Sequence, residues 1–447
     1  MNLLLRRHRS VVTALSLAAF ACFLPMQVFA STVVVYPPGG TPCTLAHPLY
    51  TSIQTAVNSV PAGSAVQVCP GNYYEQVVIT KKLTLEGIVS GSQDAAIIFS
   101  PSGGLVQNTV DVDTNNPIAA QILVQNVPAI DLVNISNLTV DGTGNMDYCG
   151  PDVQGILFQS ASGTVNHVAV RNQLPNGSPN GCQVGESIYI QTAASGDAIW
   201  GSNPPANYSV FTSTVTVENS SVHNYNKNGI TGNDTGTSLT ATGNYVQGSG
   251  VVAVPGAAQN GIQLAFGATG KVNSNIVIDN IYSDASIAAS TDILLFDTAE
   301  NSGVTVNNNT VSNSQIPIYL GTDSVGSAGD DVTVNGNKIM GTSVYDAIDV
   351  CSDGNAVTNN TIFNSAESGV HLDASCGGTG NGNTVTGNTF VESACAGVLE
   401  DVGATGNGTI TGTYYTVPFT LTSSTASCNI PARAANAKVK SKLSPVR

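Results

Sequence analysis

A short pattern that recurs along most of the chain constrains its fold more than any other feature. The pattern is a residue pair that ends in Asn, then one variable residue and one apolar residue, and its members are Asn172, Asn244, Asn280, Asn309, Asn337, Asn360 and Asn388. From Asn244 onward these asparagines are 36, 29, 28, 23 and 28 positions apart. Steps of about 20 to 50 residues are typical of a solenoid, in which each repeat stacks on its neighbours.

A second pattern alternates apolar and variable residues, as a short strand with one buried face does. It occurs nine times, for example as Ile188-Tyr189-Ile190 and as Ile318-Tyr319-Leu320. The middle residue of each triplet must then point outward, and these residues are Leu157, Tyr189, Thr231, Gln263, Leu294, Tyr319, Asp349, His371 and Leu399. Such strands, stacked in parallel at about 4.8 Å per coil, would bury one continuous aliphatic core.

The two patterns together predict an all-β protein, a right-handed parallel β-helix over residues 31–430. We interpret the asparagines as structural, because stacked Asn side chains can hydrogen-bond to one another and to the backbone at corners. Near the start, Thr51-Ser52-Ile53-Gln54 resembles a capping box, and an apolar stripe follows at Ile53, Ala56, Val57 and Val60. We therefore expect a short N-terminal helix to cap the first coil, and a final strand pair within residues 409–428.

Both ends of the chain differ from the body. Residues 1–30 carry three arginines before an apolar run and end in Val28-Phe29-Ala30, which predicts a cleaved signal peptide. The apolar run is too short for a membrane span, which needs roughly 20 residues. We expect a secreted protein, or one in the periplasm or at the cell surface. Residues 431–447 form a basic tail that we expect to be disordered.

Export changes the interpretation of the cysteines. Beyond Cys22 in the predicted signal there are eight, an even number that favours disulfides in an exported protein: Cys43, Cys69, Cys149, Cys182, Cys351, Cys376, Cys395 and Cys428. No Cys-x-x-Cys pair or Cys/His cluster indicates zinc. The connectivity stays open, although bridges between neighbours in the sequence are the simplest arrangement.

Charge limits the partners of the protein. Of 14 basic residues, three lie in the predicted signal and five in the tail, which leaves six in the body against all 29 acidic residues and a net charge of −23. Such a body would repel nucleic acid and polyanionic glycans, since recognition of phosphate or carboxylate needs basic patches. We expect a neutral polysaccharide or a cell-surface glycan as partner, with no nucleic acid.

Residues 71–87, GNYYEQVVITKKLTLEG, resemble the first coils of pectin methylesterases and NosD-like proteins. Together with the repeats, this makes nearly all of residues 31–430 similar to the pectin-lyase-like right-handed β-helix superfamily. The resemblance implies the fold, but not the chemistry. One methylesterase motif has a faint counterpart here, Gln154-Gly155-Ile156-Leu157. The other motifs of methylesterases, and those of lyases and polygalacturonases, are missing. The body also has a single arginine, Arg171. Copper handling of the NosD kind would need His or Met ligands, which are few and scattered.

Candidate functional residues come from the outward column. Asp349 and His371 fall on successive coils, where a carboxylate beside an imidazole could perform acid/base catalysis. Tyr189 and Tyr319 could stack on sugar rings, with Asp346 and Asp373 as further ligand-binding candidates. The alternative is that these polar residues merely solubilise the strand face.

No cofactor is required by the sequence, although clustered carboxylates could bind calcium. The candidates are Asp330 with Asp331, Asp279 with Asp284, and Asp292 with Asp297. The sequence thus predicts an exported β-helix repeat protein that interacts with polysaccharide through an outward strand face. The alternative is a polysaccharide-active enzyme, a glycoside hydrolase rather than a pectin lyase or esterase, that uses Asp349 and His371.

Overall fold

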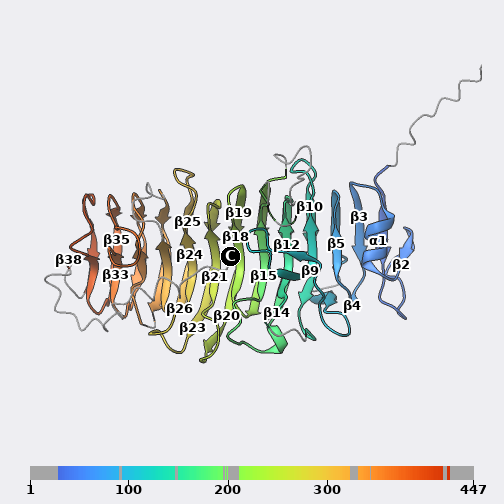
Figure 1. The fold of residues 1–447 in the computed structure, drawn as a ribbon, viewed down its shortest axis with the longest axis horizontal. Coiled ribbons are helices and arrows are strands. Elements are labelled where there is room, and N and C mark those ends of the chain that lie inside the picture. Colours follow the sequence, from blue (N-terminus) through green and yellow to red (C-terminus); the bar gives the residue numbers. More distant parts are fainter. Residues whose placement is uncertain are drawn as a thin grey trace, which may run out of the picture.

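Three long parallel sheets wind around one axis and form a right-handed β-helix (Figure 1). The computed structural model describes residues 29–89, 93–145, 149–194, 197, 199, 211–322, 331–342, 344–415 and 420–422. The predicted tail, and all but the last two residues of the predicted signal peptide, lie outside this part. Each coil adds one strand to sheet A, one to sheet B and one to sheet C, which confirms the predicted fold class.

The strands are short, and each pairs with its equivalents one coil before and one coil after. Sheet A consists of β1 (Thr32–Val35), β2 (Leu49–Tyr50), β3 (Ser64–Val68), β6 (Leu83–Gly87), β10 (Val133–Ser136), β13 (Gly163–Asn166), β16 (Ser213–Glu218), β19 (Thr237–Thr242), β22 (Thr269–Asn273), β25 (Thr305–Asn307), β28 (Thr333–Asn335), β31 (Ala356–Thr358) and β34 (Thr384–Thr386). Sheet B consists of β4 (Gly71–Tyr74), β7 (Ala96–Phe99), β11 (Thr139–Asp141), β14 (Ala169–Gln173), β17 (Ser221–Tyr225), β20 (Tyr245–Val252), β23 (Ile276–Tyr282), β26 (Thr310–Ser314), β29 (Lys338–Thr342), β32 (Thr361–Phe363), β35 (Asn388–Val391) and β37 (Gly412–Tyr414). Sheet C consists of β5 (Val77–Ile79), β9 (Pro117–Gln125), β12 (Asp152–Gln159), β15 (Glu186–Gln191), β18 (Asn228–Asn233), β21 (Asn260–Ala265), β24 (Thr291–Phe296), β27 (Ile316–Gly321), β30 (Ile348–Val350), β33 (Ser368–Leu372), β36 (Ala396–Glu400) and β38 (Thr420–Thr422), with β8 (Thr109–Val110) antiparallel to β9.

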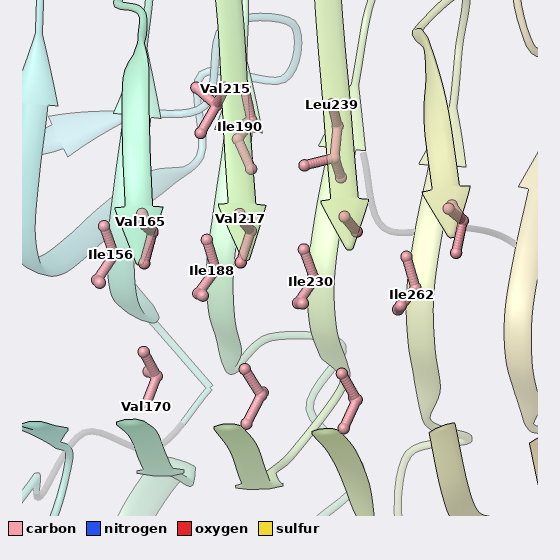
Figure 2. Close-up of a cluster of buried hydrophobic side chains, with 14 of the residues drawn as sticks. Ile156, Val165, Val170, Ile188, Ile190, Val215, Val217, Ile230, Leu239 and Ile262 are labelled. Carbon is pink, nitrogen blue, oxygen red and sulfur yellow. The ribbon is translucent and has the colours of Figure 1, made fainter. Parts of the chain in front are cut away.

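The core is a set of aliphatic columns inside the coils. Figure 2 shows Ile156, Ile188, Ile230 and Ile262 in equivalent places on neighbouring strands of sheet C, facing valines of sheets A and B. The whole predicted triplet column runs in register from β12 to β36. Burying each such side chain stabilises the fold by about 1.5–3 kcal/mol, so the column is the main source of cohesion between coils.

An asparagine ladder lines the corner between sheets A and B. In each step the backbone N–H and the side-chain amide of one Asn donate to Oδ1 of the next, at 2.8–3.0 Å. Its members are Asn244, Asn275, Asn309, Asn337, Asn360 and Asn388, which confirms the structural role predicted for the column. The residue before each Asn has a left-handed backbone, for example Asn308 at φ 57° and Gly336 at φ 69°, because the chain turns there.

The ladder differs from the prediction at two positions. Asn280 lies elsewhere in the interior, where it bonds to Tyr225 and Asp292, and Asn275 takes its place in the ladder. Asn172 has φ 60° and donates to Asp141 and Thr143. Asn172 itself therefore has the left-handed backbone at which the chain turns, and its side chain does not enter the core.

The predicted helix is present as α1 (Ile53–Ser59), capped by Ser52 and packed on the first coil through Ile53, Ala56 and Val57. Glu75 of the GNYYE motif holds the start of this helix. Its carboxylate accepts from the N–H groups of Ile53 and Gln54, both at 3.0 Å, as expected for an anion at a helix N-terminus. The motif therefore builds the cap.

Three disulfides join cysteines that are neighbours in the sequence: Cys43–Cys69, Cys149–Cys182 and Cys351–Cys376. Cys395 is also disulfide-bonded, and Cys428 lies outside the described residues. The predicted pairing of neighbours is thus confirmed for six of the eight cysteines.

Candidate functional site

The outer face of sheet C, where the candidate residues lie, is not open. The column from Leu157 to Leu399 points outward as predicted, yet every member is at most 5 % exposed. The reason is that long connections fold back over the strands. One example is the segment before β9, where Thr109 donates to the side chain of Gln159, while the N–H of Val112 and the carboxylate of Asp111 bond to the side chain of Gln191. A solvated strand face, the alternative considered for these polar residues, is therefore wrong.

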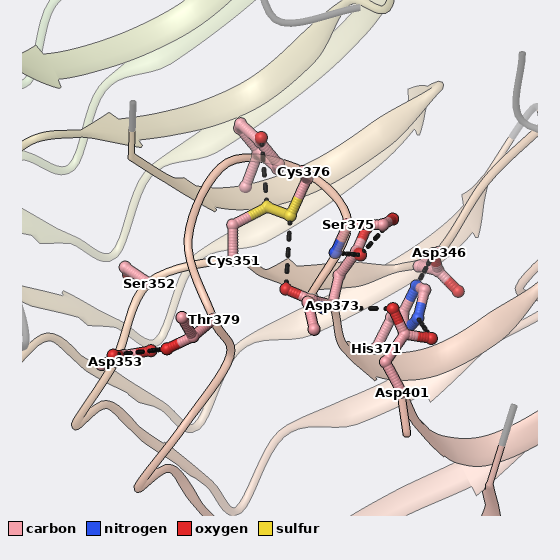
Figure 3. The surroundings of a disulfide bond; sticks show 12 residues. Asp346, Cys351, Ser352, Asp353, His371, Asp373, Ser375, Cys376, Thr379 and Asp401 are labelled. Atoms are coloured by element: carbon pink, nitrogen blue, oxygen red, sulfur yellow. Dashed lines mark hydrogen bonds and ion pairs between the residues drawn. A yellow bond between two sulfur atoms is a disulfide. The ribbon is translucent and has the colours of Figure 1, made fainter. Parts of the chain in front are cut away.

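The structure brings Asp349 and His371 together, because they are register partners on β30 and β33. Their surroundings form what we call the His371 cluster, which consists of Asp346, Asp349, His371, Asp373 and Asp401. Figure 3 shows His371 with Asp346, Asp373 and Asp401. The ring of His371 lies between two carboxylates: Nδ1 is 3.1 Å from Asp346 and Nε2 is 3.3 Å from Asp401. Both nitrogens can donate only if the ring is protonated.

Electrostatics agree with a protonated ring. Burial acts to lower the pKa of His371, but the charge and hydrogen bond of Asp346, the hydrogen bond of Asp401 and the charge of Asp373 outweigh it and raise that pKa well above its usual value. Burial likewise acts to raise the pKa of Asp401, yet the bond and charge of His371 lower it to about 2. The geometry favours a structural ion cluster, in which His371 has no free nitrogen for a base. The catalytic role of Asp349 and His371 stays a prediction.

Tyr319 and Tyr189 occupy the same column but different surroundings. Tyr319 belongs to an apolar cluster with Leu294, Phe296 and Ile316, and its hydroxyl lies 3.2 Å from Sγ of Cys351. Its ring is 2 % exposed, so it offers no stacking surface to a glycan in this structure.

Tyr189, by contrast, lines a cavity of about 240 Å³ that we call the Tyr189 cavity. The cavity lies over the beginnings of β9, β12 and β15, and the two loops joined by Cys149–Cys182 cover it. Its lining is Asp111, Asn116, Pro117, Ile118, Cys149, Gly150, Asp152, Gln183, Val184 and Tyr189. No Lys or Arg is among these residues.

Hydrogen bonds fix the polar wall of the cavity. The Tyr189 hydroxyl accepts from Asn233, at 3.0 Å, and lies 3.4 Å from the amide of Gln191. The same Gln191 amide donates to Asp111, at 2.7 Å, and to Asp234, at 3.1 Å. Burial and the charge of Asp113 raise the pKa of Asp234 to about 8, so this carboxyl group is largely neutral below that pH. The wall therefore presents fixed hydroxyl, amide and carboxyl groups.

Asp152, another residue of the lining, has a buried carboxyl group as its neighbour. Asp152 lines the cavity and accepts from the N–H of Gly185, at 2.9 Å, and from the amide of Gln154, at 3.0 Å. Glu186 is fully buried, and the charges of Asp152 and Glu186 act on each other. Burial is the main cause that raises the pKa of both groups, and for Glu186 the charge of Asp152 adds to it.

Sequence reasoning found Tyr189 but missed Asp111, Asp152 and Glu186. The first two lie outside the periodic triplets, one in a connection and one at a strand start, so the repeat patterns give no signal for them. Glu186 could have been found, because it stands two residues before Ile188 and is the register partner of Gln154. Counting back from the triplets would have placed it beside the Gln154 motif.

Comparison with known proteins gives a family match for part of the chain. Residues 242–414, less than half of the chain, match the family described as "Periplasmic copper-binding protein (NosD)". No curated protein sequence matches. In the described part of the chain, no helix has the length and hydrophobicity that a membrane span requires.

Solved structures with similar coordinates are β-helix proteins of low identity. One is a GH136 lacto-N-biosidase from Eubacterium ramulus (12 % identity, 88 % of this chain and 68 % of that one covered, TM-score 0.44). Another is the A-module of the mannuronan C-5 epimerase AlgE4 from Azotobacter vinelandii (13 %, 83 % and 94 %, 0.48). A third is the pectate lyase Pel9A (13 %, 88 % and 79 %, 0.41).

The donor set of the matched region does not fit copper. Among the described residues, ligand atoms of the metal-binding kind converge only around His371 and the adjacent Cys351–Cys376 bridge. Copper sites use imidazole, thiolate or thioether ligands, but both nitrogens of His371 face carboxylates and the two sulfurs are bonded to each other. We therefore derive no copper chemistry here. Of the calcium candidates, Asp292 bonds to Asn280 in the interior and Asp284 bonds to Ser286 at the surface, and calcium binding stays a prediction.

Proposed function

We propose that the protein is an exported β-helix protein that binds a neutral polysaccharide, and that the Tyr189 cavity holds one sugar unit of it. The observation that carries the proposal is a partly open cavity whose polar groups are fixed by hydrogen bonds before any ligand arrives. Its volume of about 240 Å³ lies below the roughly 300–1,000 Å³ of most ligand pockets, which favours a chain end or branch over a long segment.

The chemistry of the lining supports a neutral, hydroxyl-rich ligand. Asn116, Asp111 and the hydroxyl of Tyr189 supply amide, carboxyl and hydroxyl groups that hydrogen-bond to sugar hydroxyls. A uronate or phosphate would meet Asp111 and Asp152 without a compensating cation in the lining. The three disulfides support export, since such bonds persist in oxidising compartments.

Calorimetry against a panel of neutral and acidic oligosaccharides tests the proposal. Tyr189→Phe removes one polar atom from the cavity wall, and Asn116→Trp fills the space from an exposed position without touching the core. We expect a neutral oligosaccharide to bind the parent, Tyr189→Phe to weaken it about five- to ten-fold, and Asn116→Trp to abolish binding.

Tyr245→Phe is the matched control, because Tyr245 lies on the exposed face of sheet B, where its hydroxyl bonds to Gln247. It should bind as the parent does. Unchanged binding in Asn116→Trp would contradict the proposed site, and preference for a polyuronate would contradict the proposed ligand class.

A further inference from the structure

The Cys351–Cys376 bridge has two carboxyl groups beside it. Sγ of each cysteine and one carboxylate oxygen each from Asp349 and Asp373 all lie within 4.8 Å of one another. Asp349, Cys351 and Asp373 are buried, and Cys376 is half-buried. Zinc takes ligands of these two kinds, thiolate sulfur and carboxylate oxygen, and usually four of them. A full set of zinc ligands is therefore present at one place, although two of its members are bonded to each other.

Two neighbouring strands fix three of these side chains. Asp349 lies on β30 and Cys351 directly after it, and because they are two residues apart both point to the outer side of sheet C. Asp373 follows β33 in the place that Cys351 has after β30, since Asp349 and His371 are register partners. Cys376 reaches the group from the loop after Asp373, as Figure 3 shows. The group therefore rests on strands rather than on loops alone.

Hydrogen bonds and close contacts hold the group in place without a metal. Oδ1 of Asp373 accepts from the N–H and the hydroxyl of Ser375, both at 2.6 Å. Sγ of Cys376 lies 3.4 Å from the carbonyl oxygen of Asp373, and Sγ of Cys351 lies 3.2 Å from the hydroxyl of Tyr319. This hydroxyl can donate to a thiolate, as partners outside the ligand set of a metal commonly do. The surroundings thus suit Cys351 in its thiolate form as well.

The charge around the bridge also favours a cation. Asp349 and Asp373 belong to the His371 cluster, which has four aspartates and one histidine. The aspartates outnumber the histidine, so the formal charge of the cluster is negative even when the ring of His371 is protonated. A bound divalent cation, often the largest local charge in such a site, compensates a negative charge of this kind.

We propose that reduction of the Cys351–Cys376 bridge turns this group into a zinc site with Cys351, Cys376, Asp349 and Asp373 as ligands. A dithiol reduces the bridge: its two thiols join in a disulfide, and their two electrons and two protons pass to the cysteine sulfurs. Zinc then binds both sulfurs as thiolates, and the two protons go to solvent. Calcium and magnesium, which prefer oxygen ligands alone, do not fit this set. The site does not rest on the proposed function of the Tyr189 cavity.

The ligands need to move little when the bridge opens. In a tetrahedral site with zinc–sulfur and zinc–oxygen distances of about 2.3 and 2.0 Å, the ligand atoms are about 3.3–3.8 Å apart. No two of the four atoms are more than 4.8 Å apart in the bridged protein. The two sulfurs must separate, and Cys376 can give way because Gly377 and Gly378 follow it in its loop. The segments after β30 and β33 would thus stay joined in a reducing medium, by zinc in place of the covalent bond.

Zinc binding by the full chain before and after reduction tests the site. The chain is reduced with dithiothreitol, freed of it by gel filtration under argon and titrated with zinc, which has no redox chemistry and cannot re-form the bridge. We expect the reduced parent to bind about one zinc ion per chain more than reduced Cys351→Ser/Cys376→Ser does. Asp349→Asn and Asp373→Asn should each weaken this binding about 100-fold, since even partners outside the ligand set contribute about 10- to 100-fold.

Cys43→Ser/Cys69→Ser is the matched control, because it removes the same number of thiols at another bridge. It should bind zinc as the reduced parent does. Equal zinc binding by the reduced parent and Cys351→Ser/Cys376→Ser would overturn the proposal, and so would parent affinity in either aspartate variant or the same binding before reduction. If reduction unfolds the chain, zinc added during refolding should restore the β-sheet circular dichroism of the parent but not of Cys351→Ser/Cys376→Ser. A parent that stays unfolded with zinc would also overturn it.

Discussion

Replacing Asn309 by Ala should destabilise the β-helix through its asparagine ladder. Oδ1 of Asn309 accepts the backbone N–H of Asn275, at 2.9 Å, and the side-chain amide of Asn275, at 3.0 Å. Its own amide donates to the carbonyl of Val272, at 2.8 Å, and to Oδ1 of Asn337, at 2.9 Å. Asn309 is 1 % exposed, so bulk water does not reach these groups.

The magnitude follows from the donors left behind. The N–H of Asn275 loses its acceptor, and its side-chain amide keeps only its bond to the carbonyl of Ala241. A buried donor without an acceptor costs about 1–3 kcal/mol, so two of them lower the free energy of unfolding by about 4 kcal/mol. The neighbouring Asn308→Gly should change it by less than about 0.5 kcal/mol, because Asn308 has φ 57° at the exposed corner, which Gly adopts freely.

Equilibrium unfolding in guanidinium chloride compares the two variants with the parent, provided that the slopes of the three transitions agree. Hydrogen exchange adds a local measurement, since the amide of Asn275 should lose protection in Asn309→Ala but keep it in Asn308→Gly. A loss below about 1 kcal/mol in Asn309→Ala, with the Asn275 amide still protected, would refute the reasoning. It would mean that water or a backbone shift replaces the missing acceptor.

Three further predictions concern charged groups. Glu75→Ala should cost about 2 kcal/mol in thermal unfolding, since it leaves the first N–H groups of α1 without their carboxylate, and retention of the full melting temperature would contradict this role. Burial raises the pKa of Asp292 well above its value in the unfolded chain, so its contribution to stability declines as pH rises above the unfolded value. Asp292→Asn should therefore be more stable than the parent at pH 8 but not at pH 3, and an equal difference at both would argue against it. The raised pKa of His371 likewise makes its contribution decline as pH rises, but here the protonated form is the charged and stabilising one. His371→Gln should be most destabilising below the unfolded His pKa of about 6.5 and less so as pH rises through the folded value, as urea titrations at several pH values would show.

The repeats made the β-helix predictable, whereas the site depends on parts that do not repeat. The triplet column could be aligned because its residues face the core in every coil, and a slip by one would expose them. The sequence pattern fits Asn275 as well as Asn280, since each precedes apolar residues, and in the structure each follows a residue with a left-handed backbone, Ser274 and Asp279. Only the structure shows which of the two side chains enters the corner.

The burial of the sheet C face could not be predicted from the same patterns. A triplet predicts that its middle residue points away from the core, but it does not show whether a connecting segment covers that residue. The covering segments, such as that with Asp111, differ in length from coil to coil. The catalytic hypothesis for His371 rested on its register with Asp349, which the structure confirms. The triplets could not show that Asp401, which follows the last of them, bonds to the second ring nitrogen of His371.

The asparagine ladder also bears on how a protein of this kind can change its length. Every link joins the same acceptor atom to the same two donors, whether the partners are 23 or 34 residues apart in the chain. Any ladder asparagine could therefore follow any other with the same geometry. Gene segments that encode one whole coil could be duplicated or deleted without interrupting the ladder. The number of coils could then change in evolution independently of the loops.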